Sequence, residues 1–133
     1  MDAATREAVA QRAGRLCEYC RLPETADPHS AFHLEHVVPK QHGGGDGEEN
    51  LAWSCSRCNR RKGPNLAGID PSTGAVVELF HPRRQQWFDH FMFRDARIFG
   101  VTPTGRTTAQ LMDMNAHHRV QLRRELLRQG RIG

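Results

Sequence analysis

Apolar and polar positions are mixed along the first half of the chain in short stretches, which predicts short strands and a helix. The stretch 31–37 has this pattern and stops at Pro39, so we expect a strand there. A glycine-rich loop follows, and a second short strand is predicted near 51–54. A helix is expected from about Ser56, and Gly63-Pro64 weakens or ends it.

The second half of the chain predicts further short strands and then helices. A turn is expected at 70–74, followed by a strand at 75–80, a helical or mixed stretch at 83–91 and a strand at 98–101. Two helices are predicted at 105–114 and 115–129. Asn115 suits the N-cap of the last helix, and Gly130 suits its end. The length of 133 residues favours one domain, and these elements together predict an α+β fold.

Arginine dominates the basic residues of the chain. The net charge is +4, and of 19 lysine and arginine residues only Lys40 and Lys62 are lysine. Because arginine binds phosphate bidentately and stacks on bases, nucleic acid is the first partner to consider. A GC-rich genome, which favours arginine codons, explains the composition equally well.

No stretch of the chain reaches the roughly 20 apolar residues that a membrane span needs. The first 13 residues contain no apolar block of the kind found in secretory signals. We therefore expect a cytoplasmic protein that does not enter a membrane.

The four cysteines form two pairs, Cys17-x-x-Cys20 and Cys55-x-x-Cys58. In a reducing compartment such pairs favour a metal site over disulfides, and four thiolates can surround zinc tetrahedrally. The alternative of a redox dithiol is weaker because two complete pairs are present and no other cysteine is. A zinc ion with four cysteine ligands is closed, so we expect it to stabilise the fold rather than to react.

The residues between and after the cysteine pairs resemble the HNH endonucleases. The matching pattern is Cys-x-x-Cys, Glu-His-Val-Val-Pro, His-Gly-Gly, Asn-Leu and Cys-x-x-Cys-Asn-x-x-Lys, in this order. It covers about residues 10–66 and implies a ββα-metal, treble-clef-like core with a structural zinc. A weaker likeness to the C-terminal extension of stand-alone bacterial members runs over about 67–133. It is carried by Asp70-Pro71-Ser72-Thr73-Gly74, Leu79-Phe80-His81-Pro82-Arg83 and Gly105-Arg106.

The resemblance implies metal-dependent hydrolysis of phosphodiester bonds in DNA, with RNA not excluded. His36 matches the general base, a role that suits an imidazole near neutral pH. Glu35 and Asn59 match the protein ligands of a catalytic ion. Their oxygen atoms favour Mg²⁺ or Mn²⁺, although Asn59 could equally cap the helix. Asn50 matches the residue that orients the catalytic histidine, a role compatible with its place in a turn.

Strand geometry complicates the predicted site, because neighbouring side chains on a strand face opposite ways. Glu35 and His36 can serve one site only if the strand ends or bends between them. Strict alternation would instead place His33 beside Glu35.

The start of the predicted helix is surrounded by basic side chains that could contact phosphate. These candidates are Arg57, Arg60, Arg61 and Lys62, together with His42 from the glycine-rich loop. A solvated basic turn is the alternative. A zinc-stapled module that binds nucleic acid without cutting it is the alternative to the enzyme as a whole.

Two arginines fall on the apolar side of the last predicted helix. A helical wheel over 116–128 gathers Val120, Leu126 and other apolar residues on one arc, and Arg119 and Arg123 lie inside that arc. A buried arginine needs a partner, so we expect internal pairing with a carboxylate, with contact to DNA as the alternative.

Overall fold

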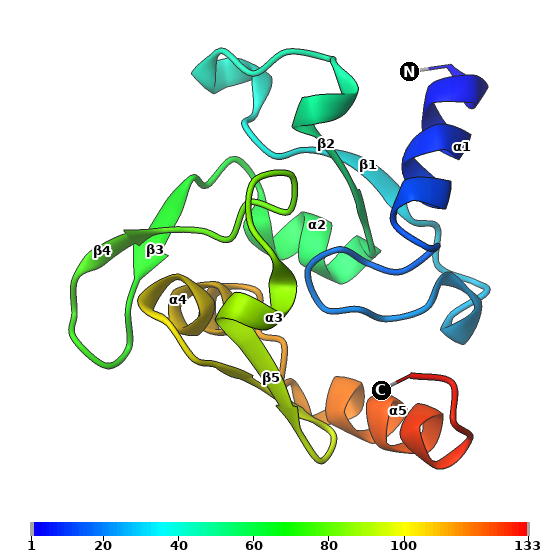
Figure 1. Cartoon of the computed structure of the whole chain (residues 1–133), viewed down its shortest axis with the longest axis vertical. Helices are drawn as coiled ribbons and strands as arrows, with labels where there is room; N and C mark the ends of the chain where they lie inside the picture. Colours follow the sequence, from blue (N-terminus) through cyan, green and yellow to red (C-terminus); the bar gives the residue numbers. More distant parts are fainter. Residues whose placement is uncertain (1, 133) are drawn as a thin grey trace.

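The computed structural model describes residues 2–132 and has an α+β fold, as the sequence predicts (Figure 1). Among these residues, the regular structure comprises five α-helices, three two-stranded antiparallel hairpins and three short 3₁₀ helices (Glu24–Ala26, Lys40–His42 and Glu48–Asn50). In chain order the elements are α1 (Ala3–Arg12), β1 (His33–His36), β2 (Leu51–Ser54), α2 (Ser56–Lys62), β3 (Ala67–Ile69), β4 (Val76–Glu78), α3 (Trp87–His90), β5 (Phe91–Arg94), β6 (Arg97–Gly100), α4 (Pro103–Leu111) and α5 (His117–Arg128).

The hairpin of β1 and β2 is the centre of the first half. Glu35 pairs with Ala52, and His36 pairs with Leu51. All four residues of β2 are buried, whereas in β1 only Glu35 is. Helix α2 follows β2 directly and packs against β1, so strand, strand and helix form the expected ββα unit.

Helix α1 attaches to the central hairpin through arginine side chains. The guanidinium of Arg12 donates to the carbonyl oxygens of Glu48 and Leu51. Arg6 donates to the carbonyl oxygen of Phe32 and lies 4.7 Å from the ring centroid of Trp53. Together with Val9 and Ala10, which are buried in the apolar core, these contacts hold the helix on the protein.

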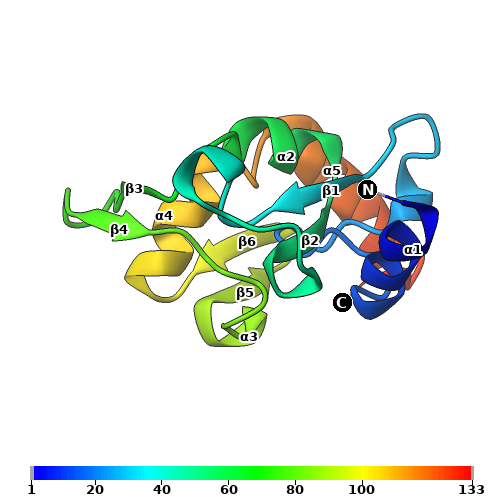
Figure 2. The same ribbon diagram turned by 90° about the horizontal axis from the view of Figure 1, so that it is seen from above.

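The second half packs onto the first through one shared apolar cluster. The cluster contains Val9 and Trp53 from the first half and Phe91, Ile98 and Met112 from the second half. The indole of Trp87 donates a hydrogen bond to the carbonyl oxygen of Tyr19, which joins α3 to the first cysteine pair. Helix α2 contacts α5 through Arg57 and His118. Figure 2 shows the β3–β4 hairpin at one end of the molecule and α1 at the opposite end.

Several elements differ from the sequence-based expectation. Helix α1 and strands β3 and β5 have no counterpart in it, and 83–91 contains only the single turn of α3. Asn115 is not the N-cap of α5, a position that Ala116 occupies. Its side chain instead pairs with the backbone N–H and carbonyl of Ile98 in β6, because that buried strand edge has no other partner there. Gly130 does end the helix, with a φ of 69°.

Within residues 2–132, no helix has both the length and the apolar character required to span a bilayer.

Candidate metal centre and active site

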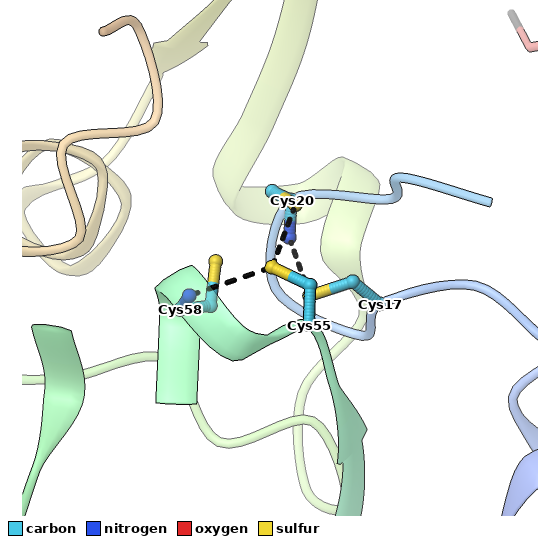
Figure 3. A group of neighbouring side chains, drawn as sticks. All are labelled: Cys17, Cys20, Cys55 and Cys58. Atoms are coloured by element: carbon cyan, nitrogen blue, oxygen red, sulfur yellow. Dashed lines mark hydrogen bonds between the residues drawn. The ribbon is translucent and has the colours of Figure 1, made fainter. Parts of the chain in front are cut away.

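The four cysteines meet at one point beside the N-terminus of α2 (Figure 3). Their sulfur atoms all lie within 4.8 Å of one another, and all four residues are buried. Ligands at the corners of a tetrahedron around zinc, with bonds of about 2.3 Å, are about 3.8 Å apart. The Sγ atoms of Cys20 and Cys55 are 3.8 Å apart, so the cluster fits a zinc ion.

Both Cys-x-x-Cys turns hold their thiolates through backbone N–H groups. The N–H of Cys20 donates to Cys17 Sγ, and the N–H of Cys58 donates to Cys55 Sγ, at 3.5 and 3.4 Å. The second of these bonds also caps the first turn of α2, since Cys55 is its N-cap. The metal site and the start of the helix are therefore built by the same residues.

Arg119 and Arg123 of α5 are buried and have partners inside the protein, but within residues 2–132 these are not the expected carboxylates. Arg119 Nη2 lies 3.3 Å from Cys58 Sγ and 3.6 Å from Cys55 Sγ. Burial lowers the pKa of Arg119, but the charges of Cys20, Cys58 and Cys55 outweigh burial and hold the pKa above its ordinary value. The guanidinium of Arg123 donates to the carbonyl oxygens of Ala96 and Met114.

Glu35 lies inside the protein, with 5% of its surface exposed. Its Oε2 accepts a hydrogen bond from the hydroxyl of Tyr19. Its Oε1 accepts no hydrogen bond of good geometry but lies 2.7 Å from the Nζ of Lys62. Burial raises the pKa of Glu35 above its ordinary value, and the Lys62 charge and hydrogen bonds from Lys62 and Tyr19 oppose that rise.

The structure corrects the expectation for Lys62 as a surface contact to nucleic acid. Its side chain is buried, with 1% exposed, and its ammonium donates to the carbonyl oxygen of Val37. With the ion pair to Glu35, this places the lysine in the interior, where an ammonium needs such partners. The sequence did not predict the burial of Lys62, because the lysine belongs to a basic stretch whose arginines are exposed or half-buried.

His36 lies on the other side of β1 and faces the glycine-rich loop. Its Nε2 is 2.7 Å from Asp46 Oδ1, and the Nζ of Lys40 is 3.2 Å from the same oxygen. The hydrogen bond with His36 and that with Lys40 hold the pKa of Asp46 below its ordinary value. Glu35 and His36 therefore keep the alternation of a regular strand and bind different partners. Over residues 2–132 no hydrogen bond or ion pair joins them.

Asn50 fixes the loop that carries Asp46. Its Oδ1 accepts from the N–H of Val38, and its Nδ2 donates to the carbonyl oxygens of Val38 and Gly45, each at 2.9 Å. The backbone of Gly44 lies close to Val38: a Cβ atom at position 44 would be 1.7 Å from the Val38 carbonyl oxygen. Asn50 thus fixes the backbone that follows His36, at Val38 and Gly45, and among residues 2–132 its side chain forms no hydrogen bond with the imidazole.

Asn59 lies in α2, one turn before Lys62, and is half-buried. Residues three apart share one helix face, and Lys62 reaches Glu35 from that face, so Asn59 faces β1 as well. The side chain does not cap α2, whose N-cap is Cys55. Within the described residues, the side-chain amide of Asn59 forms no hydrogen bond.

The basic candidates on the surface are partly neutralised. Arg57 and Arg61 both pair with Asp113, at 3.0 and 2.9 Å, and these pairs hold the pKa of Asp113 below its ordinary value. Arg60 and His42 are exposed, and among residues 2–132 neither forms an ion pair. Asp113 belongs to the turn between α4 and α5, so a residue of the C-terminal half neutralises part of the positive charge of α2.

Two residues at the site have no role in the sequence-based expectation. Tyr19 is the only tyrosine of the chain and sits within the first cysteine pair, where its hydroxyl reaches Glu35. Asp46 is the single acidic residue in the run from Gly43 to Gly47, where only its isolation among glycines could have marked it.

Comparison with known families agrees with this geometry. Residues 17–65 match the family described as HNH endonuclease. No curated protein and no solved structure matched the chain. The matched segment contains the four-cysteine cluster, the β1–β2 hairpin and α2. The resemblance seen in the sequence is therefore confirmed for residues 17–65, the part of the chain that matches this family.

Proposed function

We propose that this protein is a metal-dependent endonuclease that hydrolyses phosphodiester bonds in DNA, with His36 as the general base. The observation that carries the proposal is the pairing of His36 with Asp46. A half-buried imidazole hydrogen-bonded to an exposed carboxylate, on a strand beside a four-cysteine cluster, suits proton transfer from water.

The two nitrogen atoms of His36 take separate roles in this proposal. A carboxylate at Nε2 favours the tautomer in which Nε2 carries the hydrogen. Nδ1 then carries the lone pair that accepts the proton of the attacking water. Asn50 acts through the backbone, since it fixes the turn after His36 and the loop that brings Asp46 to it.

Glu35 and Asn59 suit the protein ligands of a catalytic Mg²⁺ or Mn²⁺ ion. Glu35 Oε1 is a buried carboxylate oxygen that lies beside a cation, the ammonium of Lys62, and such an oxygen also suits a hard metal ion. Lys62 holds that place, so its ammonium must move aside for the ion. Glu35 and His36 face opposite sides of β1, so the end of the strand must also bend for both to act on one phosphate. When bound, such an ion polarises the phosphoryl oxygen and stabilises the leaving oxygen.

Cleavage of supercoiled plasmid tests the proposal. The wild type and His36→Ala are compared with Mg²⁺, with Mn²⁺ and with EDTA, and the zinc content is measured after each incubation. We expect nicking that requires the added metal and is lost in His36→Ala at unchanged zinc content. Intact plasmid under every metal would refute the DNase activity, and single-stranded RNA run in parallel would reveal a ribonuclease. Binding without cutting would identify a nucleic-acid-binding module.

A further inference from the structure

We propose that Arg119 is part of the zinc site, and that with Arg123 it supplies the positive charge that four thiolates around zinc require. Helix α5 would then retain the metal, although it lies about 60 residues beyond the last cysteine and outside the matched family segment. The inference is independent of the proposed nuclease activity.

Arg119 contacts cysteine sulfurs with one side of its guanidinium and backbone carbonyl oxygens with the other. One nitrogen, Nη2, faces two cysteine sulfurs from the second pair, at 3.3 and 3.6 Å. The other, Nη1, donates to the carbonyl oxygens of Met112 and Asp113 at 3.2 and 3.4 Å. The carbonyl contacts hold the planar guanidinium against the sulfurs, and only 6% of the residue is exposed.

Charge explains why two arginines lie on the apolar side of α5. A zinc ion with four thiolates carries a net charge of −2, which is costly to bury without compensation. Arg119 and Arg123 are buried at 6% and 4% exposure, one helical turn apart. Both line a cavity of about 240 Å³ together with Cys20 and Cys55. Neither arginine forms an ion pair with a carboxylate among residues 2–132, so the thiolates are their available counter-charge.

This arrangement ties the C-terminal half to the metal. Residues that orient and hydrogen-bond metal ligands typically change metal affinity by about 10–100-fold when they are replaced. The N–H groups of Arg119 also withdraw electron density from the two sulfurs. Loss of Arg119 is therefore expected to weaken zinc binding and to make both thiolates better electron donors.

The test is the release of zinc from the full-length protein to an excess of a neutral chelator, TPEN. A neutral chelator is needed because the basic cavity would attract an anionic one. We expect Arg119→Met to release zinc about 10–100-fold faster than the wild type. Arg124→Met is the matched control, since Arg124 lies on the exposed side of α5, and it should release zinc at the wild-type rate.

Cobalt substitution separates a role at the sulfurs from a general loss of packing. In the Co²⁺ protein, the sulfur-to-metal charge-transfer bands should move to lower energy in Arg119→Met and stay unchanged in Arg124→Met. If Arg119→Met does not fold, Arg119→Lys takes its place, because an ammonium keeps the charge but cannot reach both sulfurs. Wild-type release rates and band positions in the folded Arg119 variant would overturn the proposal.

Discussion

His36 and Asp46 face each other across the loop that follows β1, with 2.7 Å between Nε2 and Oδ1. Lys40 contacts the same carboxylate oxygen from the other side of the loop. Ten residues separate His36 from Asp46, and Asn50 closes the loop between them through its bonds to Val38 and Gly45. The orientation of the imidazole therefore depends on a loop side chain outside the strand.

Replacement of Asp46 tests this dependence. In Asp46→Asn the amide no longer favours the hydrogen on Nε2, so kcat for plasmid nicking should fall by about 10–100-fold, less than the loss in His36→Ala. KM should change little, because Asp46 does not bind substrate in this proposal. Glu49→Gln is the control, since it removes an exposed acid from the same loop. Equal kcat in Asp46→Asn and the control would contradict the role.

Glu35→Gln should abolish metal-dependent nicking while the protein keeps its zinc. The substitution also leaves the Lys62 ammonium buried without a counter-charge, which should lower the free energy of unfolding by about 3–5 kcal/mol. Urea denaturation measures this loss.

The double variant Glu35→Gln, Lys62→Met separates the two effects of that change. It removes the uncompensated charge, so stability should recover in part while nicking stays absent. A double variant that cuts DNA like the wild type would show that Glu35 is not a metal ligand.

Asn50→Ala should loosen the loop that carries Asp46. Three hydrogen bonds are lost, and the Val38 N–H is left without its partner, so we expect the free energy of unfolding to fall by about 2–3 kcal/mol. Asn50→Asp tests the direction of the bonds, because a carboxylate would face two carbonyl oxygens where Nδ2 now donates. It should be no more stable than Asn50→Ala, and a stability close to the wild type would contradict the described network.

Cys17→Ser should lose zinc and with it the cooperative unfolding transition, since one ligand of a closed four-cysteine site is removed. Metal analysis and near-ultraviolet circular dichroism measure the two effects. His36→Ala is the comparison, because its side chain lies outside the cysteine cluster and the variant should keep both properties. A folded Cys17→Ser protein without zinc would refute a stabilising metal.

Asp113→Asn should strengthen binding to DNA. The carboxylate neutralises Arg57 and Arg61, and its removal frees both guanidinium groups for phosphate. The slope of log K against log salt concentration should become steeper by about 1 to 2, at roughly 0.9 per phosphate contact.

Asp95→Asn is the matched control for this change. Asp95 also has a positive φ, is exposed and carries the same charge change. Weaker binding by Asp113→Asn than by Asp95→Asn would mean that Asp113 orients the arginines rather than masks them.

The strands and the helix of residues 17–65 could be predicted because the local sequence signals there agree with one another. The first strand, predicted over 31–37, is β1 (His33–His36) and ends before Pro39. The range 51–54 is β2 itself, and Ser56 begins α2, as expected. The cysteine spacing was a reliable signal because each pair needs only one turn of chain to present two thiolates. Helix α1 was not predicted because its apolar face is small: Val9 and Ala10 are its buried residues, and arginine contacts to backbone oxygens and to Trp53 add to them.

The sequence by itself determined the metal cluster, the order of the core elements and the identity of His36 and Glu35 as candidates. The tertiary structure alone decided what those side chains contact. Lys62 turned inward to Glu35, Asp46 reached His36, and Arg119 reached the cysteines from α5. The physical reason is that a charge is stable in the interior only beside an opposite charge or oriented dipoles, and those partners come from segments far apart in the chain.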